Sequence, residues 1–269
     1  MSSDCELCNF RNPKGAVTAV IIQNGRLLML KRSEEPFKGM WDLPGGYMQE
    51  METPEQGILR ELKEELEVKS KTTFIKCFPG YGYWKGDKFP IVSHAFLVEI
   101  QGEIKLNEEN SAYEWVPLKE IESVAFDSNM DILKFLKEKF IFDLDRIREL
   151  VKQLDPSAEV KEQSLYKAVL GGYLATEYDN GILVGMGWAF PRQTLLRKQA
   201  IVEDMIVDES QRGKGLGYKV LNSVIQQAKA DGVEVVELTT NPKREAANKL
   251  YQKYGFQLHT TNHYLYKVI

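Results

Sequence analysis

Three glutamates in the first half of the sequence stand at a spacing that could hold a metal ion. Glu61, Glu64 and Glu65 occupy positions i, i+3 and i+4, so a helix here would carry all three carboxylates on one face. Such like charges repel each other, whereas Mg²⁺ or Mn²⁺ would remove the conflict because hard cations prefer carboxylate oxygen. By itself the triplet is more typical of a solvated acidic helix face than of a metal site.

Two local signals position this helix. The segment Thr53-Pro54-Glu55-Gln56 offers a capping threonine, a proline at the first helical position and a glutamine that can complete a capping box. We therefore predict a helix from this segment to about Glu67. Just upstream, Gly45 and Gly46 form a pair that would let the backbone approach a ligand or a metal closely.

A second glycine-rich turn lies in the other half of the chain, over residues 211–217, between a predicted strand and a predicted helix. Backbone N–H groups at a helix N-terminus bind phosphate, and glycines let the ligand come near. The turn is not a P-loop, and Tyr218 takes the place of the third glycine of a dinucleotide motif. A flexible turn without a ligand is the alternative interpretation.

The first half resembles the Nudix hydrolases over about residues 11–139. From Gly46 the chain carries the family's box at one register, with Glu52, Arg60, Glu61, Leu62, Glu64 and Glu65 at the fixed places. The departure is Glu67, which stands where the family has glycine.

The resemblance implies a Nudix α/β/α sandwich that hydrolyses a nucleoside diphosphate linked to another group, with Mg²⁺ or Mn²⁺ as cofactor. It makes Glu64 and Glu65 metal ligands, with the Gly45 carbonyl as an extra ligand. Glu61 would be a further ligand or the base, oriented by Arg60, and Glu52 would assist near the metal. A downstream acid is expected at Glu108 or Glu109.

The second half resembles the GNAT acetyltransferases over about residues 143–269. The segment over residues 202–208 precedes Arg212, Gly215 and Gly217, and the segment from Ala247 to Phe256 follows at the family's separation. The resemblance implies a mixed-sheet fold and transfer of an acetyl group from acetyl-CoA to an amine.

The same resemblance assigns individual roles. The CoA pyrophosphate would lie on the turn, and Asn248 would touch the pantetheine arm. Tyr251 would protonate the leaving thiolate, and Glu203 is a candidate base for the amine, although a solvent-facing strand carboxylate is the alternative. The residues of the turn are Gln211, Arg212, Gly213, Lys214, Gly215, Leu216 and Gly217.

Beyond these motifs, the pattern predicts an α/β or α+β protein of two domains, 1–140 and 141–269. Strands are expected over 16–22, 26–30, 72–77, 91–100 and 114–117 in the first domain. The second should contain strands over 165–177, 181–190, 201–207 and 233–240. Helices are expected over 129–139, 143–154, 216–229 and 245–254.

Composition limits the class of protein. The 269 residues are 43 % hydrophobic and 28 % charged, which excludes a disordered chain. The net charge of −4 shows no excess of positive charge that would bind nucleic acid or an anionic membrane. The three cysteines and the absence of an apolar N-terminal stretch predict a cytoplasmic protein. Cys5 and Cys8 are either ordinary thiols or half of a zinc site.

Two functional hypotheses therefore stand together. The first is a bifunctional enzyme whose partners are a nucleoside diphosphate derivative and an amine acceptor, either a small molecule or a protein. The second is a Nudix module that senses a nucleotide without hydrolysing it and regulates the attached acetyltransferase. Intact Arg60, Glu61, Glu64 and Glu65 favour the first.

Overall fold

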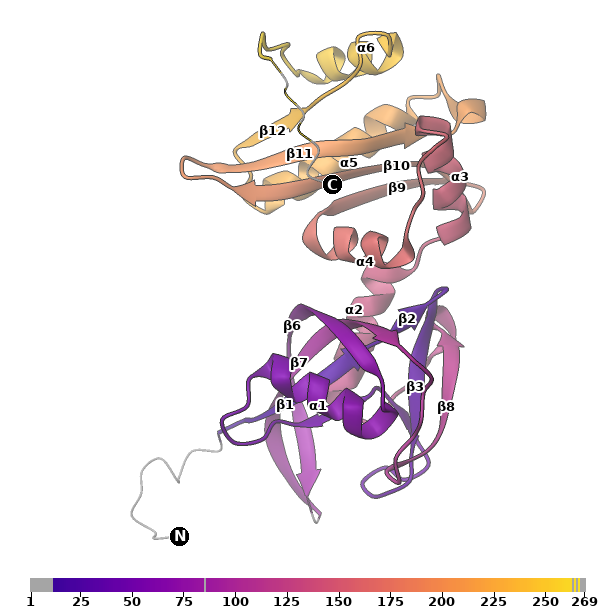
Figure 1. The fold of residues 1–269 in the computed structure, drawn as a ribbon. Coiled ribbons are helices and arrows are strands. Elements are labelled where there is room, and N and C mark those ends of the chain that lie inside the picture. The colour runs from indigo at the N-terminus through magenta and orange to yellow at the C-terminus, as the bar shows by residue number, and fades with distance from the viewer. Residues whose placement is uncertain (1–11, 85, 263, 265, 267–269) are drawn as a thin grey trace. The chain divides into compact units, whose positions relative to one another are not determined.

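The computed structural model describes residues 12–84, 86–262, 264 and 266, and it divides into two compact units (Figure 1). Unit 1 comprises residues 1–144 and 161–170, and unit 2 comprises residues 145–160 and 171–269. Cys5 and Cys8 lie outside the described residues, while Cys77 is a free, exposed thiol. In the described part of the chain, no helix combines the length and apolar character that crossing a membrane requires.

The described residues of unit 1 form two sheets and three α-helices. One sheet has the order β5-β1-β7-β6, with β1 parallel to β7 and the other pairs antiparallel; the second joins β2, β3 and β4, with β8 on β3. The strands are β1 (Lys14–Val20), β2 (Ile22–Gln23), β3 (Arg26–Arg32), β4 (Trp41–Asp42), β5 (Gly45–Tyr47), β6 (Lys69–Trp84), β7 (Asp87–Gln101) and β8 (Asn110–Pro117). The helices are α1 (Pro54–Leu66), α2 (Asp127–Phe140) and α4 (Glu162–Gly171), with a 3₁₀ turn η2 (Leu118–Glu120).

The first sheet of unit 1 is covered on both faces, because successive residues of β1 point to opposite sides. Val17 and Ala19 are buried in the core with Ile58 and Leu62 of α1. On the other face, the hydroxyl of Thr18 bonds the side chain of Asn129 in α2 at 3.1 Å. This arrangement confirms the expected α/β/α sandwich.

Helix α1 begins as its sequence predicts. The Thr53 hydroxyl accepts from the N–H of Gln56, and the Gln56 side chain accepts from the N–H of Thr53, which completes the capping box. The helix ends at Glu67, whose φ of 53° lies in the left-handed region. A glycine would adopt this conformation without the steric conflict that a Cβ creates.

We predict that Glu67→Gly stabilises unit 1 by about 1 kcal/mol, because it removes the left-handed strain. The ion pair between Glu67 and Lys105, at 3.2 Å, is largely exposed and contributes little. Urea unfolding would measure the gain. Glu67→Gln is the matched control, since it loses the same charge but keeps the Cβ; an equal gain in both variants would contradict the conformational explanation.

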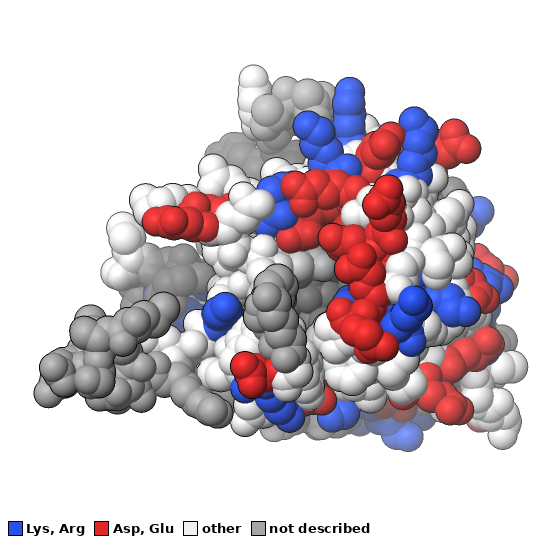
Figure 2. Space-filling view, turned by 90° about the horizontal axis from the view of Figure 1, so that it is seen from below, with Lys and Arg blue, Asp and Glu red and all other residues white. Residues whose placement is uncertain are grey.

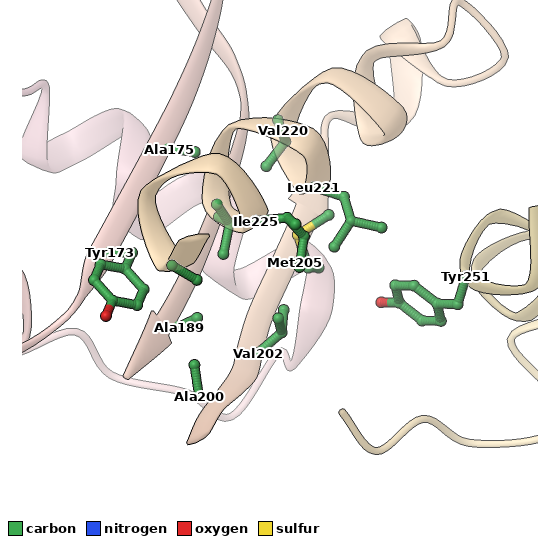
Figure 3. Packing of buried hydrophobic residues seen from close by; sticks show 12 residues of the cluster. Tyr173, Ala175, Ala189, Ala200, Val202, Met205, Val220, Leu221, Ile225 and Tyr251 are labelled. Atoms are coloured by element: carbon green, nitrogen blue, oxygen red, sulfur yellow. The ribbon is translucent and has the colours of Figure 1, made fainter. Parts of the chain in front are cut away.

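Unit 2 contains one mixed sheet of order β12-β11-β10-β9, antiparallel except for the parallel pair β11·β12. Helix α5 covers one face, where Ala189, Val202 and Met205 of the sheet pack with Val220 and Leu221 of the helix (Figure 3). The strands are β9 (Tyr173–Asp179), β10 (Ile182–Gln193), β11 (Lys198–Val207) and β12 (Val235–Leu238). The helices are α3 (Leu144–Leu154), α5 (Leu216–Ala230) and α6 (Glu245–Tyr254), with a 3₁₀ turn η3 (Glu209–Gln211).

One predicted strand is wrong at its start. The segment expected as a strand from Leu165 to Glu177 begins as α4, and β9 starts only at Tyr173. A short apolar run fits either period, and here Tyr166 and Val169 are buried at a helical spacing of three residues. The strand predicted over 16–22 spans β1 and the start of β2, which belong to different sheets, and the strand predicted over 72–77 continues to Trp84 in β6. The other predicted strands and helices are present as elements, with ends shifted by a few residues.

Helix α4 belongs to unit 1, although its neighbours in the chain on both sides belong to unit 2. The carboxylate of Glu162 accepts from the backbone N–H groups of Asn24 and Gly25, at 2.8 and 2.9 Å, in the turn between β2 and β3. Tyr166 is buried with its ring 4.8 Å from that of Phe140. The single boundary expected at residue 140 stays a prediction, because the contacts of α4 divide the chain differently.

We predict that Glu162→Ala destabilises unit 1 by about 1–2 kcal/mol, since two charge-assisted hydrogen bonds to the turn are lost. The amides of Asn24 and Gly25 should then exchange hydrogen faster, which NMR or mass spectrometry would detect. Ser164→Ala on the same helix is the control, because Ser164 is exposed. Unchanged protection of the two amides in Glu162→Ala would refute the proposed anchoring role.

Candidate active sites

Arg60 is the centre of the first candidate site. Its guanidinium donates to Glu52 through Nε at 2.8 Å and Nη2 at 3.0 Å, and its Nη1 donates to Glu61 at 2.8 Å and to Glu64 at 3.0 Å. Nη2 also donates to the carbonyl of Tyr47 at 3.0 Å. These bonds raise the pKa of Arg60 above its usual range, Glu52 contributing most, and they lower the pKa of Glu52. One cation therefore gathers three of the four predicted carboxylates.

Glu65, the fourth carboxylate, is buried and turns away from Arg60 toward the glycine pair. It accepts from the N–H of Gly45 at 2.8 Å and from the side-chain amide of Asn110 at 3.3 Å. Burial raises the pKa of Glu65 to about 8, and the neighbouring carboxylates of Glu61 and Glu109 add to that effect. Burial also raises the pKa of Glu61, against the opposing influence of Arg60.

The glycine pair is required by close packing. A Cβ on Gly45 would stand 2.1 Å from the carbonyl oxygen of Val17, and the φ of Gly45 is 142°. A Cβ on Gly46 would stand 2.4 Å from a carboxylate oxygen of Glu61. Strand β5 can therefore lie between β1 and the carboxylates only because both residues lack a side chain.

The chemistry of this donor set fits a hard divalent cation. Glu61 and Glu65 are buried carboxylates with raised pKa values, and a cation would favour their ionised forms. Within the residues described, no three His, Cys, Asp or Glu side chains are arranged as a ready ligand set. Acidic side chains also form a band across the face of the molecule seen from below (Figure 2).

Asn110 is a residue of this site that sequence reasoning missed. It is buried, and it contacts Glu65 from the start of β8, 45 residues away along the chain. Its neighbour Glu109, one of the two expected downstream acids, raises the pKa of both Glu61 and Glu65. In the sequence, only its position next to Glu109 could have indicated that Asn110 belongs to this site.

The second candidate site lies in unit 2, where β11 and β12 separate. The two strands pair from Gln199 and Val235 as far as Val202 and Leu238, after which β11 continues to Val207 without this partner. Strand β11 also bulges against β10, because Glu203 and Asp204 together oppose Trp188. Beyond the bulge, β11 pairs with no described strand on the side that β12 leaves, and the carbonyls of Met205 and Val207 accept from the side chains of Arg244 and Arg212.

A cavity of about 870 Å³ occupies this part of unit 2. The glycine turn forms one wall, where Gly215 is the N-cap of α5 with a φ of 77° and has open space where a Cβ would stand. The backbone of β11 and the start of α6 form others. Six of the predicted turn residues line it, namely Gln211, Arg212, Gly213, Gly215, Leu216 and Gly217.

Two predicted contact residues lie elsewhere. The ammonium of Lys214 donates to the side chain of Gln211. The side-chain amide of Asn248 donates to the carbonyls of Asn241 and Arg244, at 3.1 and 3.0 Å, and so closes the loop before α6. Neither residue lines the cavity, and Glu203 is an exposed residue of the bulge that does not line it either.

Tyr251 of α6 lines the same cavity and is 7 % exposed. Burial raises the pKa of its hydroxyl, and Arg244 opposes that shift. The hydroxyl is therefore protonated at neutral pH and can donate a proton. Lys243, Arg244 and Lys253 also line the cavity and were not predicted; the basic residues around the α6 motif were the signal.

Comparison with known families matches both halves of the chain. Residues 12–138 match the family model of the NUDIX domain, and residues 139–256 match that of the acetyltransferase (GNAT) family. An ADP-ribose pyrophosphatase of Methanocaldococcus jannaschii is 31 % identical over 134 residues, which span 48 % of this chain and 77 % of the relative. The nucleoside triphosphatase NudI of Escherichia coli is 30 % identical over 135 residues, spanning 46 % of this chain and 94 % of that protein.

The acetyltransferase half has shorter matches. An L-2,4-diaminobutyric acid acetyltransferase of Halalkalibacterium halodurans is 41 % identical over 54 residues, spanning 20 % of this chain and 29 % of the relative. The chain belongs to the Nudix hydrolases in its first half and to the GNAT acetyltransferases in its second. It is therefore a fusion enzyme of these two classes.

Proposed function

We propose that unit 1 hydrolyses a nucleoside diphosphate linked to another group, with a divalent cation as cofactor. The observation that carries this proposal is the cluster of carboxylates around Arg60, of which Glu61 and Glu65 are buried. A bound Mg²⁺ or Mn²⁺ would neutralise the diphosphate and lower the pKa of water. The matched relatives differ in the substrates that their names give, so we propose a substrate class and not one particular nucleotide.

Each residue of this cluster has a proposed role. Glu61, Glu64 and Glu65 hold the cation, together with the carbonyl of Gly45. Glu61 can instead take the proton of the attacking water, and Arg60 orients it through the 2.8 Å bond. Glu52 assists by fixing Arg60 from the opposite side. We propose Glu109 as the downstream acid, because its neighbour Asn110 donates to Glu65 at 3.3 Å and the charge of Glu109 raises the pKa of both Glu61 and Glu65.

The test is a substrate panel with Mg²⁺ that includes ADP-ribose, nucleotide sugars, dinucleotides and nucleoside triphosphates. Phosphate released after phosphatase treatment reports cleavage, and Glu64→Gln is the control. We expect turnover of at least one nucleotide derivative by the native chain and a loss of more than about 100-fold in the variant. Binding without turnover in both proteins would instead support a nucleotide sensor that regulates the acetyltransferase.

We propose that unit 2 transfers an acetyl group from acetyl-CoA to an amine of a small molecule or a protein. The cavity of about 870 Å³ beside the glycine turn carries this proposal. The N–H groups of residues 211–217 bind the pyrophosphate of CoA at the N-terminus of α5. Tyr251 donates its proton to the departing thiolate. Glu203 lies outside the cavity wall, so it would accept the amine proton through water. The cysteine count supports a cytoplasmic setting for both reactions.

Thermal unfolding with acetyl-CoA tests the second site. A ligand that binds only the folded state raises Tm, and we expect such a rise with acetyl-CoA but none with adenosine. Gly215→Ala is the informative variant, because its φ of 77° disfavours any residue with a Cβ and the turn would distort. No shift with millimolar acetyl-CoA in the native chain would refute the transferase proposal.

A further inference from the structure

A second cavity, of about 600 Å³, lies in unit 1. Its wall consists of Lys14 and Gly15 at the start of β1, Phe89 on β7, and the segment Tyr47–Glu50 that leads out of β5. None of these residues belongs to the carboxylate cluster. The volume is in the range of pockets that hold a nucleotide-sized ligand.

The segment Tyr47–Glu50 connects this cavity to the carboxylates. The carbonyl of Tyr47 accepts from Arg60 at 3.0 Å, and the N–H of Gln49 donates to Glu52 at 2.9 Å. Backbone groups of the segment thus face the carboxylate cluster, while its residues also line the cavity. A ligand that occupied both places would follow this one segment.

The wall of the cavity offers two aromatic rings and a cation. The ring centroids of Tyr47 and Phe89 are 5.8 Å apart at an interplanar angle of 38°, and the ammonium of Lys14 stands 4.8 Å from the centroid of Phe89. Tyr47 is 37 % exposed, and its hydroxyl occupies the space that a side chain at Gly82 would need. Because Gly82 has no side chain, the Tyr47 ring can lie beside the Phe89 ring.

This combination suits a planar heteroaromatic group. Aromatic faces stack on any nucleobase, and the ammonium of Lys14 and the carboxylate of Glu50 can bond acceptors and donors on the edge of a base. An alkyl chain has no flat face with which to stack on the two rings. A nucleobase is also the group that a nucleoside diphosphate derivative carries at one end.

We propose that the cavity formed by Lys14, Phe89 and the segment Tyr47–Glu50 binds the nucleobase of the substrate that unit 1 hydrolyses. This inference rests on the proposed hydrolase function, which it deepens by naming a recognition site. The carboxylates hold the diphosphate, and the segment Tyr47–Glu50 sets the distance between diphosphate and base. Recognition of the base is thereby separate from the residues that act on the bond.

Direct binding tests the inference independently of turnover. Isothermal calorimetry on Glu64→Gln protein with Mg²⁺ would compare ribose 5-phosphate with AMP, GMP, CMP and UMP. At least one nucleotide should bind tenfold or more tightly than ribose 5-phosphate, and adding Phe89→Ala should remove most of that difference, since stacking on an aromatic ring is worth about 5- to 100-fold. Phe74→Ala is the matched control, because Phe74 is a 49 % exposed aromatic residue outside the cavity wall.

Three results decide the question. A base-dependent affinity that Phe89→Ala abolishes and Phe74→Ala preserves supports the site, and in turnover the same variant should raise KM with little change in kcat. An affinity that is equal with and without a base, or that survives Phe89→Ala, overturns it. Should Phe89→Ala unfold, Lys14→Gln replaces it with the same expected direction. If the hydrolase proposal itself is wrong, the result is different: nucleotides still bind, but the native chain shows no turnover.

Discussion

Replacing Arg60 with alanine should reduce hydrolysis by about two to three orders of magnitude, the loss found when a preorganised charged donor is removed from an active site. The guanidinium makes five hydrogen bonds, to three carboxylates and one carbonyl. Without it, Glu52, Glu61 and Glu64 lose the cation that holds them in place. The loss should fall on kcat as well as on KM, because the orientation of Glu61 is disturbed and not only substrate binding.

Two variants make this prediction specific. Arg60→Lys keeps the charge but cannot reproduce the planar fork that reaches Glu52, Glu61 and Glu64 together, so we expect an intermediate loss. Lys63→Ala removes an exposed positive charge from the same helix and should leave hydrolysis unchanged. The proposed role would be refuted by an Arg60→Ala enzyme that keeps a third or more of the native kcat at saturating Mg²⁺.

The sequence predicted the helix that carries the glutamates. The capping residues and the spacing of the glutamates lie within one helix, and local patterns determine both. The carbonyl of Tyr47 and the amide of Asn110 reach the same carboxylates only through tertiary packing. No short-range pattern carries that information, so these two partners could not be predicted.

The second site shows the same division. The turn over residues 211–217 was predicted from its glycines and from the strand and helix around it. The separation of β11 from β12 after Val202 depends on where two distant strands stop pairing, which no local pattern gives. Asn248 also illustrates the limit, because its motif position implied a ligand contact while its amide bonds the carbonyls of Asn241 and Arg244.

Removing divalent cations should make unit 1 less stable as the pH rises from about 6 to 8. Burial raises the pKa of Glu65 to about 8, far above the value of 4.5 for an ordinary glutamate. A raised pKa in the folded state means that the native protein holds a proton that the unfolded chain has lost. The contribution of Glu65 to the free energy of unfolding is therefore greatest below pH 4.5, and it is lost as the pH rises through about 8. Burial raises the pKa of Glu61 as well, in the same direction.

The size of the effect makes it measurable. A shift from 4.5 to about 8 corresponds to a free energy of unfolding that changes by roughly 3–5 kcal/mol from below pH 4.5 to above pH 8, of which about 2 kcal/mol falls between pH 6 and 8. Asp42 is also buried and its pKa is raised to about 6, so its contribution to the slope fades within the first pH unit above 6. The slope in that interval should then report chiefly on the carboxylates of the site.

Mg²⁺ should reverse this loss, because a cation bound to ionised Glu65 competes with the proton and binds more tightly as the pH rises. Urea unfolding at pH 6, 7 and 8, with EDTA or with Mg²⁺, would measure both effects. Glu65→Gln should flatten the slope and be more stable than the native chain at pH 8 in EDTA. Glu64→Gln removes the same charge from a side chain that is 53 % exposed, and it should retain the slope. If native protein and Glu65→Gln show the same slope in EDTA, the buried carboxylate is not the titrating group, and its pairing with the Gly45 N–H is strong enough to keep it ionised.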